Sequence, residues 1–529
     1  PTGGGNLITT TGATFTGNIA TAGISSVTAG YNNFVAGVNA GNSIVSGGNY
    51  NTVVGDEAGT AITTGDNNVA VGYGSLVANT TGSANAAVGL SCLDSNTTGN
   101  HNNALGYLAL QANTTGSQNT AIGGTALYAN TTASNNTAVG YTALTANTTG
   151  DENVAVGQGA LDANTTGLAN TSVGQDSLGA NTTGVSNSAF GRTAMVLNTT
   201  GGFNTALGRD ALYANTTASN NTAVGFASSE SNTTGTSNVS LGSNSLQENT
   251  TGGNNTAVGA SALKTNTTAS YNTAFGASAM FANITGSENV ASGLQSLTTN
   301  TTGSNNSAFG TQALRFNTVG GSNAAVGHAA LYYNTTGSFN TAVGVDALKN
   351  NSTASLNVAV GRHALLGCTT GSDNTGIGTY ALDSTTTGAA NIAIGHGAIS
   401  TSSTASGQCT LGNSAISNLR CNDTSISSLS DSRDKTDVID SPFGLDFINT
   451  VRPVQFLWDS RDGNAKDGTT RIGFLAQELL AACEGNNAVL DLVLDDNPDK
   501  LEAKYGNLLP IMVQAIQELS ARIEVLEGE

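Results

Sequence analysis

The sequence repeats one phrase of 17 residues, and this repeat restricts more than any other feature how the chain can fold. The segments 141–157 and 158–174 read YTALTANTTGDENVAVG and QGALDANTTGLANTSVG, and both end on the same glycine. That anchor glycine recurs at every seventeenth position from Gly55 to Gly412, without an insertion. A unit this short cannot bury a core of its own, so it must stack on its neighbours. The strict register therefore predicts a repetitive structure and not a disordered tract.

Each unit contains two pieces that favour extended structure, with a turn between them. In Asn136–Gly140, Thr and Val alternate with Asn and Ala, which is typical of a strand. We interpret Thr142–Ala146 as a second extended piece, with Leu144 as its one large apolar residue. The residues Asn147–Gly150 have the Asn, Thr and Gly chemistry of a turn. Because alanine replaces this glycine elsewhere, as at Ala133, we expect no left-handed backbone there.

This pattern predicts a mainly β fold, an elongated β-solenoid with strand, turn, strand and turn in every coil. Successive coils would stack at about 4.8 Å, the spacing of paired strands. We expect the alanine and valine positions to form dry inner ladders, and the recurring asparagines to stack as amide ladders. The abundance of Gly, Asn and Thr disfavours helices. The small core also favours self-association of the rod.

Composition argues against several functions. The net charge of −19 would repel the phosphates of a nucleic acid. No apolar run is long enough to span a membrane. No signal peptide is visible and the chain begins with Pro1, so we expect N-terminal targeting information to be missing. The sequence has no nucleotide, cofactor or metal motif, and His328 and His396 follow anchor glycines in a slot expected to face solvent. We therefore expect neither a cofactor nor a metal site.

Two features of the repeat region each allow two interpretations. The five cysteines, at positions 92, 368, 409, 421 and 483, have no metal-ligand spacing. They are either buried or half-buried thiols, which we favour, or disulfides between chains near an axis. The Asn-Thr-Thr phrase at Asn79, Asn113 and Asn147 is either a repeated turn, which we favour, or a glycosylation acceptor.

The composition changes abruptly at residue 430. More than half of the charged residues lie from Ser430 onward, together with Trp458, the one tryptophan. This indicates a separate, small α/β domain. We predict helices at 442–449 and 507–527, a hairpin of strands at 454–458 and 471–475, and a further strand at 488–494.

The last predicted helix carries an apolar seam. Its members follow the 3-4-3-4-3 spacing that is typical of the a and d positions of a coiled coil. They are Leu509, Met512, Ile516, Leu519, Ile523 and Leu526. Either this helix packs on its own domain or it joins a bundle between chains, and we favour the bundle.

Three motifs follow one another in the C-terminal segment: S-D-S-R-D-K at 430–435, G-F-L-A-Q-E at 473–478 and A-I-Q-E-L at 515–519. This ordered set resembles the endosialidase-type intramolecular chaperone domain found at the C-terminus of phage tail fibres and tailspikes. The repeats resemble, less specifically, the head repeats of trimeric autotransporter adhesins, which carry a small-residue N-x-x-A-[IV]-G phrase. That second resemblance implies a homotrimer whose coils pack about a common axis.

The chaperone resemblance implies a domain that trimerises, directs the folding of the fibre upstream and then cuts itself off. By this resemblance Ser430 is the nucleophile, Lys435 is its partner, and the cut lies between Leu429 and Ser430. A serine hydroxyl needs a base to become a nucleophile, and a lysine can serve where burial favours its neutral amine. Asp431 and Arg433 match the motif, and we expect them to have structural roles.

Together these features predict a trimeric, phage tail fibre-like protein that attaches to a host surface through a glycan or protein receptor. The alternative is a bacterial cell-surface or secreted adhesin. Any enzyme activity would be a single-turnover serine autoproteolysis, and the location would be a virion tail fibre or the cell exterior. The solenoid carboxylates, such as Asp56, Asp151 and Asp210, are too scattered for a polysaccharide-degrading tailspike. We predict a connector at 1–50, the repeat shaft at 51–415, a linker with the cleavage site at 416–429 and the chaperone domain at 430–529.

Overall fold

The computed structural model describes residues 24–25, 29–416, 430–457, 468–499 and 501–528. Most of the first half of the predicted connector lies outside these residues, as do nearly all of the predicted linker, Leu429, Cys421 and Trp458. The chain divides into two compact units, Pro1–Gly321 and Ser322–Glu529.

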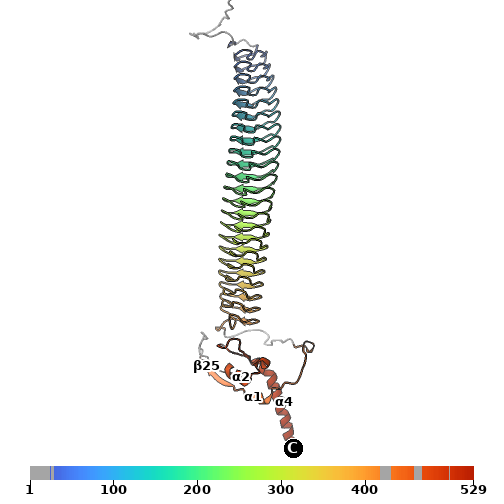
Figure 1. Ribbon diagram of the computed structural model, residues 1–529, viewed down its shortest axis with the longest axis vertical. Helices are drawn as coiled ribbons and strands as arrows, with labels where there is room; N and C mark the ends of the chain where they lie inside the picture. The colour runs from blue at the N-terminus through green and yellow to red at the C-terminus, as the bar shows by residue number, and fades with distance from the viewer. Residues whose placement is uncertain (1–23, 26–28, 417–429, 458–467, 500, 529) are drawn as a thin grey trace, which may run out of the picture. The chain divides into compact units, whose positions relative to one another are not determined.

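The first unit is a β-solenoid in which each coil contributes one short strand. Equivalent residues of neighbouring coils pair in parallel, so that Thr137 of β8 lies opposite Val154 of β9. Figure 1 shows these strands as successive arrows along the stacked coils. The first strand, β1, instead pairs antiparallel with β2. The strands are β1 (Ile24–Ser25), β2 (Phe34–Ala36), β3 (Thr52–Val54), β4 (Val69–Val71), β5 (Ala86–Val88), β6 (Asn103–Leu105), β7 (Thr120–Ile122), β8 (Thr137–Val139), β9 (Val154–Val156), β10 (Thr171–Val173), β11 (Ser188–Phe190), β12 (Thr205–Leu207), β13 (Thr222–Val224), β14 (Val239–Leu241), β15 (Thr256–Val258), β16 (Thr273–Phe275), β17 (Val290–Ser292) and β18 (Ser307–Phe309).

Only one of the two predicted extended pieces is a strand. The segment Thr142–Ala146 is a turn, and the prediction of a second strand is wrong. Thr142 and Leu144 both adopt the left-handed conformation, with φ of 56° and 55°. As a result the N–H of Thr142 donates to Gly124 O in one neighbouring coil, whereas that of Leu144 donates to Ala160 O in the other. The turn thus satisfies its backbone groups between coils without forming a β ladder.

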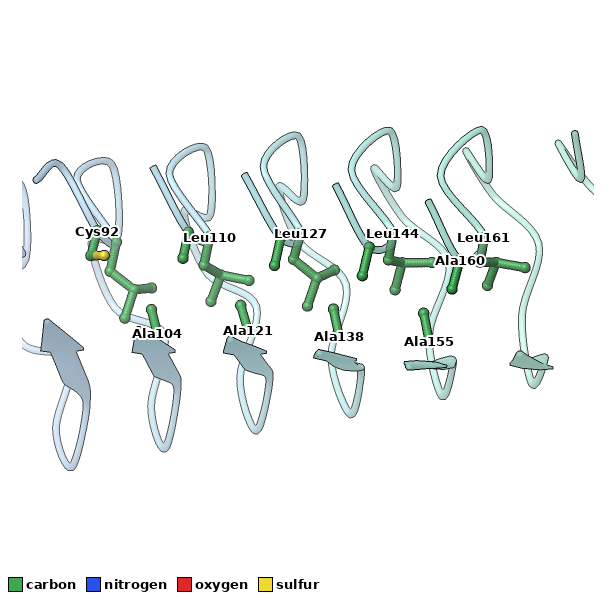
Figure 2. Close-up of a cluster of buried hydrophobic side chains, with 14 of the residues drawn as sticks. Cys92, Ala104, Leu110, Ala121, Leu127, Ala138, Leu144, Ala155, Ala160 and Leu161 are labelled. Atoms are coloured by element: carbon green, nitrogen blue, oxygen red, sulfur yellow. The ribbon is translucent and has the colours of Figure 1, made fainter. Parts of the chain in front are cut away.

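The core of each coil lies between the strand and this turn. Ala138 points inward from the strand, toward Leu144 from the turn, and both side chains are fully buried. Figure 2 shows the same pairing along several coils. The prediction of an inner alanine ladder is confirmed, but that of an inner valine ladder is wrong, because Val139 is only half-buried. Successive strand residues face opposite sides, so an inward Ala138 places Thr137 and Val139 on the outer face.

Two columns of buried asparagine side chains run along the coils, as predicted. In one column, Asn153 N donates to Asn136 Oδ1 of the preceding coil at 2.9 Å, and Asn153 Nδ2 donates to Gly167 O at 2.9 Å. In the other, Asn147 Nδ2 donates to Asn130 Oδ1 at 2.9 Å and to Gly150 O at 3.0 Å. The second column contains the Asn-Thr-Thr asparagines. Their burial and hydrogen bonds favour the turn interpretation over glycosylation at Asn79, Asn113 and Asn147.

The backbone conformation at the anchor position requires a glycine. Gly140 has a φ of 141°, and a Cβ atom added to it would lie 2.4 Å from Gly157 O of the next coil. Residues with a side chain rarely adopt such a conformation. Gly150, in the Asn-Thr-Thr turn, lies outside the left-handed region, as the alanine at position 133 led us to expect.

The second unit begins with further coils of the same kind, whose strands also pair in parallel. These strands are β19 (Ala324–Val326), β20 (Thr341–Val343), β21 (Val358–Val360), β22 (Thr375–Ile377), β23 (Ile392–Ile394) and β24 (Cys409–Leu411). The C-terminal region has a different, mixed α/β structure, with several elements labelled in Figure 1. Its elements are η1 (Ser432–Asp434), α1 (Leu445–Ile448), β25 (Val454–Leu457), β26 (Thr470–Gly473), α2 (Ala476–Ala482), α3 (Asn487–Leu490), β27 (Val493–Leu494), β28 (Glu502–Ala503), η2 (Tyr505–Asn507) and α4 (Leu508–Glu527).

The predicted elements of this region are largely present. The hairpin is confirmed, because β25 and β26 pair antiparallel, and so is the long final helix, α4. The predicted helix at 442–449 is shorter and corresponds to α1. The strand predicted at 488–494 is wrong for most of its length, since Asn487–Leu490 is the helix α3 and only Val493–Leu494 is extended.

A small apolar core holds the C-terminal region together. It includes Leu479 and Cys483 of α2 and its C-cap, with Leu508 and Ile511 of α4. Over the part of the chain that the structure describes, no helix is long and apolar enough to cross a membrane. The described cysteines are free thiols. Cys92, Cys368 and Cys483 are buried as expected, whereas Cys409 is exposed, contrary to expectation, because it lies on the outer face of β24.

Candidate functional site

The two predicted catalytic residues, Ser430 and Lys435, lie together at the start of the C-terminal region. Lys435 Nζ donates a hydrogen bond to Ser430 Oγ at 2.6 Å. The single 3-10 turn η1 separates them, and Lys435 follows it as the C-cap, where its backbone N–H donates to Ser432 O. This turn reverses the chain enough to bring two side chains five residues apart into contact.

Asp431 and Arg433 stabilise the same turn. Asp431 is the N-cap of η1, and its Oδ1 accepts from the backbone N–H of Arg433 at 2.9 Å. The guanidinium group of Arg433 also donates to both carboxylate oxygens. These hydrogen bonds lower the pKa of Asp431 and raise that of Arg433. The contacts of both residues are with the turn itself, as a positioning role requires.

Both members of the Ser430–Lys435 pair are exposed in the single chain. A lysine accepts a proton from a serine hydroxyl only as the neutral amine, a form that burial favours. The turn therefore brings the candidate nucleophile and the candidate base into contact, and catalysis by this pair would also need a covering that excludes water. The carbonyl group of Leu429 lies outside the described residues.

The second motif, Gly473–Glu478, connects several elements of the region. The ring of Phe474 packs edge-on against that of Tyr505, with centroids 5.4 Å apart. The backbone N–H of Phe474 donates to the Tyr505 hydroxyl at 3.2 Å. Glu478 forms an ion pair with Arg452, which raises the pKa of Arg452. The spacing of the motif identified these residues, but their partners are far away in the sequence and became apparent only in the structure.

The third motif contains Glu518 of α4. Its Oε2 accepts a hydrogen bond from the backbone N–H of Leu445 at 2.9 Å, and this is the largest cause of the lowered pKa of Glu518. Leu445 is the first residue of α1, so the carboxylate lies at the N-terminus of that helix. Glu518 thus joins the first and last helices of the C-terminal region.

The motifs at the start and in the middle of this region lie in a segment that matches one known family. Residues 430–490 match the family described as the chaperone of endosialidase. The matched segment begins at the candidate nucleophile and includes both S-D-S-R-D-K and G-F-L-A-Q-E, so the predicted resemblance is confirmed for these residues. The chaperone match ends before α4, and A-I-Q-E-L lies beyond it. Searches of curated proteins and of solved structures gave no match.

Helix α4 packs one face on its own domain and leaves another exposed. Leu508, Ile511 and Ala515 are its buried residues. The predicted seam lies on the other side, with exposed fractions from 43% for Leu519 to 73% for Leu526. The alternative in which α4 packs on its own domain is confirmed for the face of Leu508, Ile511 and Ala515, which is offset from the a and d positions. The bundle between chains stays a prediction. The exposed seam residues are Leu509, Met512, Ile516, Leu519, Ile523 and Leu526.

Some acidic residues of the coils accept hydrogen bonds from a neighbouring coil. Asp56 Oδ1 accepts from Val38 N at 3.0 Å, and Asp151 Oδ1 accepts from Ser134 N at 2.6 Å. Such carboxylates act as acceptors for a neighbouring coil. Within the described ranges, no group of three or more His, Cys, Asp or Glu side chains is placed to hold a metal ion. His328 and His396 are exposed, as their slot after the anchor glycine predicts.

Proposed function

We propose that this chain is a trimeric fibre protein whose C-terminal domain assembles the fibre and then removes itself. The proposed domains are a connector at 1–50, the repeat shaft at 51–415, a linker at 416–429 and the chaperone domain at 430–529. The observation that carries the proposal is the 2.6 Å contact between Lys435 Nζ and Ser430 Oγ, at the first residue of the chaperone match. The solenoid upstream supplies the fibre on which such a chaperone acts.

In the proposed reaction, Ser430 Oγ attacks the carbonyl carbon of Leu429 while Lys435 takes the hydroxyl proton. The bond between this carbonyl carbon and the Ser430 nitrogen breaks, and the nitrogen leaves as an amine with the proton. An ester then joins Leu429 to Ser430 Oγ, and water hydrolyses it to a Leu429 carboxylate and a free Ser430. The nucleophile departs with the released domain, so each chain reacts once.

Assembly provides a way to control this reaction. The exposed seam of α4 supplies an apolar surface for a bundle between chains. A trimer that also covers the turn around η1 excludes water from Ser430 and Lys435 and favours the neutral amine. Cleavage then follows correct assembly and does not precede it.

The fibre would attach a phage tail to a host surface through a glycan or protein receptor. A bacterial cell-surface or secreted adhesin is the second candidate, and the likeness of the repeats to adhesin heads supports it. Both candidates place the assembled fibre outside the host cytoplasm, and neither requires nucleic-acid binding, membrane insertion or a cofactor.

Three variants test the cleavage. Ser430→Ala should leave only the full-length chain on a denaturing gel, whereas the native chain gives two fragments that separate at residue 430. Lys435→Arg should do the same, because a guanidinium retains the donor but is not a base. Ser432→Ala changes a neighbouring exposed hydroxyl and should cleave normally.

Fragments from Ser430→Ala would overturn the autoproteolysis. Light scattering on the native protein should give the mass of three shafts, and a stable monomer would overturn the trimer.

A further inference from the structure

The outer face of the solenoid sheet carries an unusual surface in both units. In each strand the residue just before the anchor glycine points away from the core, and we call these residues the outer column. Most of them are Val, Leu, Ile or Phe, from Val54 to Phe309 in the first unit and from Val326 to Leu411 in the second. Many are well exposed, such as Leu105 at 51% and Phe275 at 45%. The outer column therefore presents an apolar side chain in nearly every coil.

Charged residues are absent from this face. The strands β2 to β24 contain no Asp, Glu, Lys or Arg. Other positions of the same coils accept charge freely, for example Arg192 and Arg209 directly after anchor glycines and Asp176 two residues after one. The coil as such tolerates charge, so its absence from the strands is a property of the face.

A parallel sheet with one open, apolar face is also incomplete as a fold. Parallel sheets are almost always covered on both faces. Here Ala138 and its equivalents face the core, while the outer column faces solvent in the single chain. A row of exposed apolar side chains of this length marks an interaction site.

We propose that the outer column is the contact between copies of this chain in the assembled fibre, with equivalent coils of the chains side by side. A copy of the chain offers an apolar group at nearly every coil with the same axial spacing, about 4.8 Å, which a globular partner does not. The uncharged faces also let chains that each carry a net charge of −19 approach without local repulsion. The inference rests on the proposed trimer for the number of chains, and it goes further by naming the face and the register.

The outer column also distinguishes the aligned register of neighbouring chains from a shifted one. Its side chains differ in size along the first unit, where Ser292 lies between Phe275 and Phe309. In a trimer aligned coil to coil, the same residue of all three chains lies at the same height along the fibre. The three Ser292 side chains then form a layer between a layer of three Phe275 and a layer of three Phe309. A slip by one coil brings phenylalanine and serine to the same level, which mismatches the packing. The interior, with nearly the same alanine and leucine in each coil, does not distinguish one coil from the next.

Cross-linking on the full chain tests the face. Ile122→Cys, in a background in which Cys409→Ser and Cys421→Ser remove other thiols, should give a covalent dimer with a short thiol-specific cross-linker. Tyr141→Cys is the matched control, because Tyr141 is more exposed, at 62% against 40% for Ile122, but lies outside the sheet. It should show no dimer.

Register is tested by expressing Ile122→Cys and Val173→Cys chains together. Peptide mass spectrometry should find residue 122 linked to residue 122 and residue 173 linked to residue 173. Mixed links, or equal cross-linking of the Tyr141→Cys control, would overturn the proposed register or face.

A charge at the same position provides an independent measurement. Ile122→Asp should lower the trimer fraction in analytical ultracentrifugation, whereas Tyr141→Asp should not. A trimeric native protein with no cross-link at residue 122 and no effect of Ile122→Asp would overturn this inference and leave the proposed function intact. Cross-links without cleavage would overturn the autoproteolysis alone, and a monomeric native protein would overturn both.

Discussion

The repeat coils and the C-terminal region bury their polar and apolar groups in different ways. In a coil, Asn147 and Leu144 find their partners in the same chain, one coil before or after. In the C-terminal region, α4 buries Ile511 within its domain but leaves the seam around Ile516 exposed. The buried polar and apolar groups of a coil are thus satisfied by the neighbouring coils. The C-terminal helix, in contrast, has an apolar face that its own domain does not cover.

This difference bears on how each region could align the chains of a fibre. Nearly every coil presents the same asparagine and leucine to its neighbour. The ladder bonds alone therefore tolerate a shift of the pairing by whole repeats. The C-terminal region is not repetitive, and its motifs define unique contacts such as that between Glu518 and Leu445. Under the proposed function, the C-terminal region and the outer column would supply the alignment that the ladder bonds alone do not.

The largest effect should come from the seam of α4. Ile516→Asp places a charge at the middle of the exposed seam, where a bundle between chains would bury it. We expect loss of the trimer and of cleavage, with the helix content unchanged in circular dichroism. Gln517→Asp adds the same charge at an exposed neighbour and should assemble normally. If Ile516→Asp remained a cleaved trimer, the seam would have no part in assembly.

Next in size should be the effect of the anchor glycine. Gly140→Ala introduces a Cβ atom against Gly157 O at a φ of 141°, and strain plus overlap should cost on the order of 4 kcal/mol. Gly150→Ala is the control. A Cβ there would also lie close to the next coil, 2.2 Å from Gly167 O, but Gly150 lies outside the left-handed region and other coils carry alanine there, as at Ala133. Hydrogen exchange should show faster opening around residue 140 in the first variant only. Equal protection in both would mean that the coil relaxes around the new methyl group.

A smaller loss is expected from the amide ladder. Asn181→Ala removes the bonds from Asn181 Nδ2 to Asn164 Oδ1 and Gly184 O. Gly184 O keeps the bond from Asn170 Nδ2, whereas the buried Asn164 Oδ1 loses its donor. The cost should be about 2 kcal/mol. Thr183→Ala, at an exposed position of the same turn, should cost little. Thermal unfolding of the fibre compares them, and an equal melting temperature would show that the ladder adds nothing to stability.

The smallest effect concerns the thiols. Burial raises the pKa of Cys368 to about 11, so this thiol stays protonated in the folded chain above the ordinary value of 9.0. Its contribution to stability should be complete below pH 9.0 and be lost as the pH rises toward 11, and Cys368→Ala should abolish this dependence. Thiol labelling at pH 8 should modify exposed Cys409 at once and Cys368 only after unfolding. Rapid labelling of both would show that the coils open locally.

The position of Cys368 also explains a polar atom in the ladder. Among the described residues, Asn351 Oδ1 is buried without a hydrogen-bond partner. In the preceding coils this oxygen accepts from the asparagine 17 residues further on, as Asn198 Nδ2 donates to Asn181 Oδ1. Cys368 occupies that place in the next coil and has no amide to offer, so the column of asparagines ends there.

Much of the candidate site was visible in the sequence because its residues are close together. Ser430 and Lys435 lie within one motif, and one 3-10 turn suffices to join them. The partners Arg452 and Glu478 are separated by 26 residues, and no local pattern indicates that they meet. The exposure of the pair likewise depends on what packs around it, which a motif does not describe.

By itself, the sequence determined the 17-residue register, the strand in each coil, the amide ladders and the change of structure at residue 430. These follow from local alternation, turn chemistry and strict repetition. Only the tertiary structure decided that Ala138 faces inward and Val139 outward, and that Leu144 reaches the core from a left-handed turn. Alternation indicates that a strand has two faces, but the narrow space opposite the leucine decides which face fits inside, and only the small side chain fits.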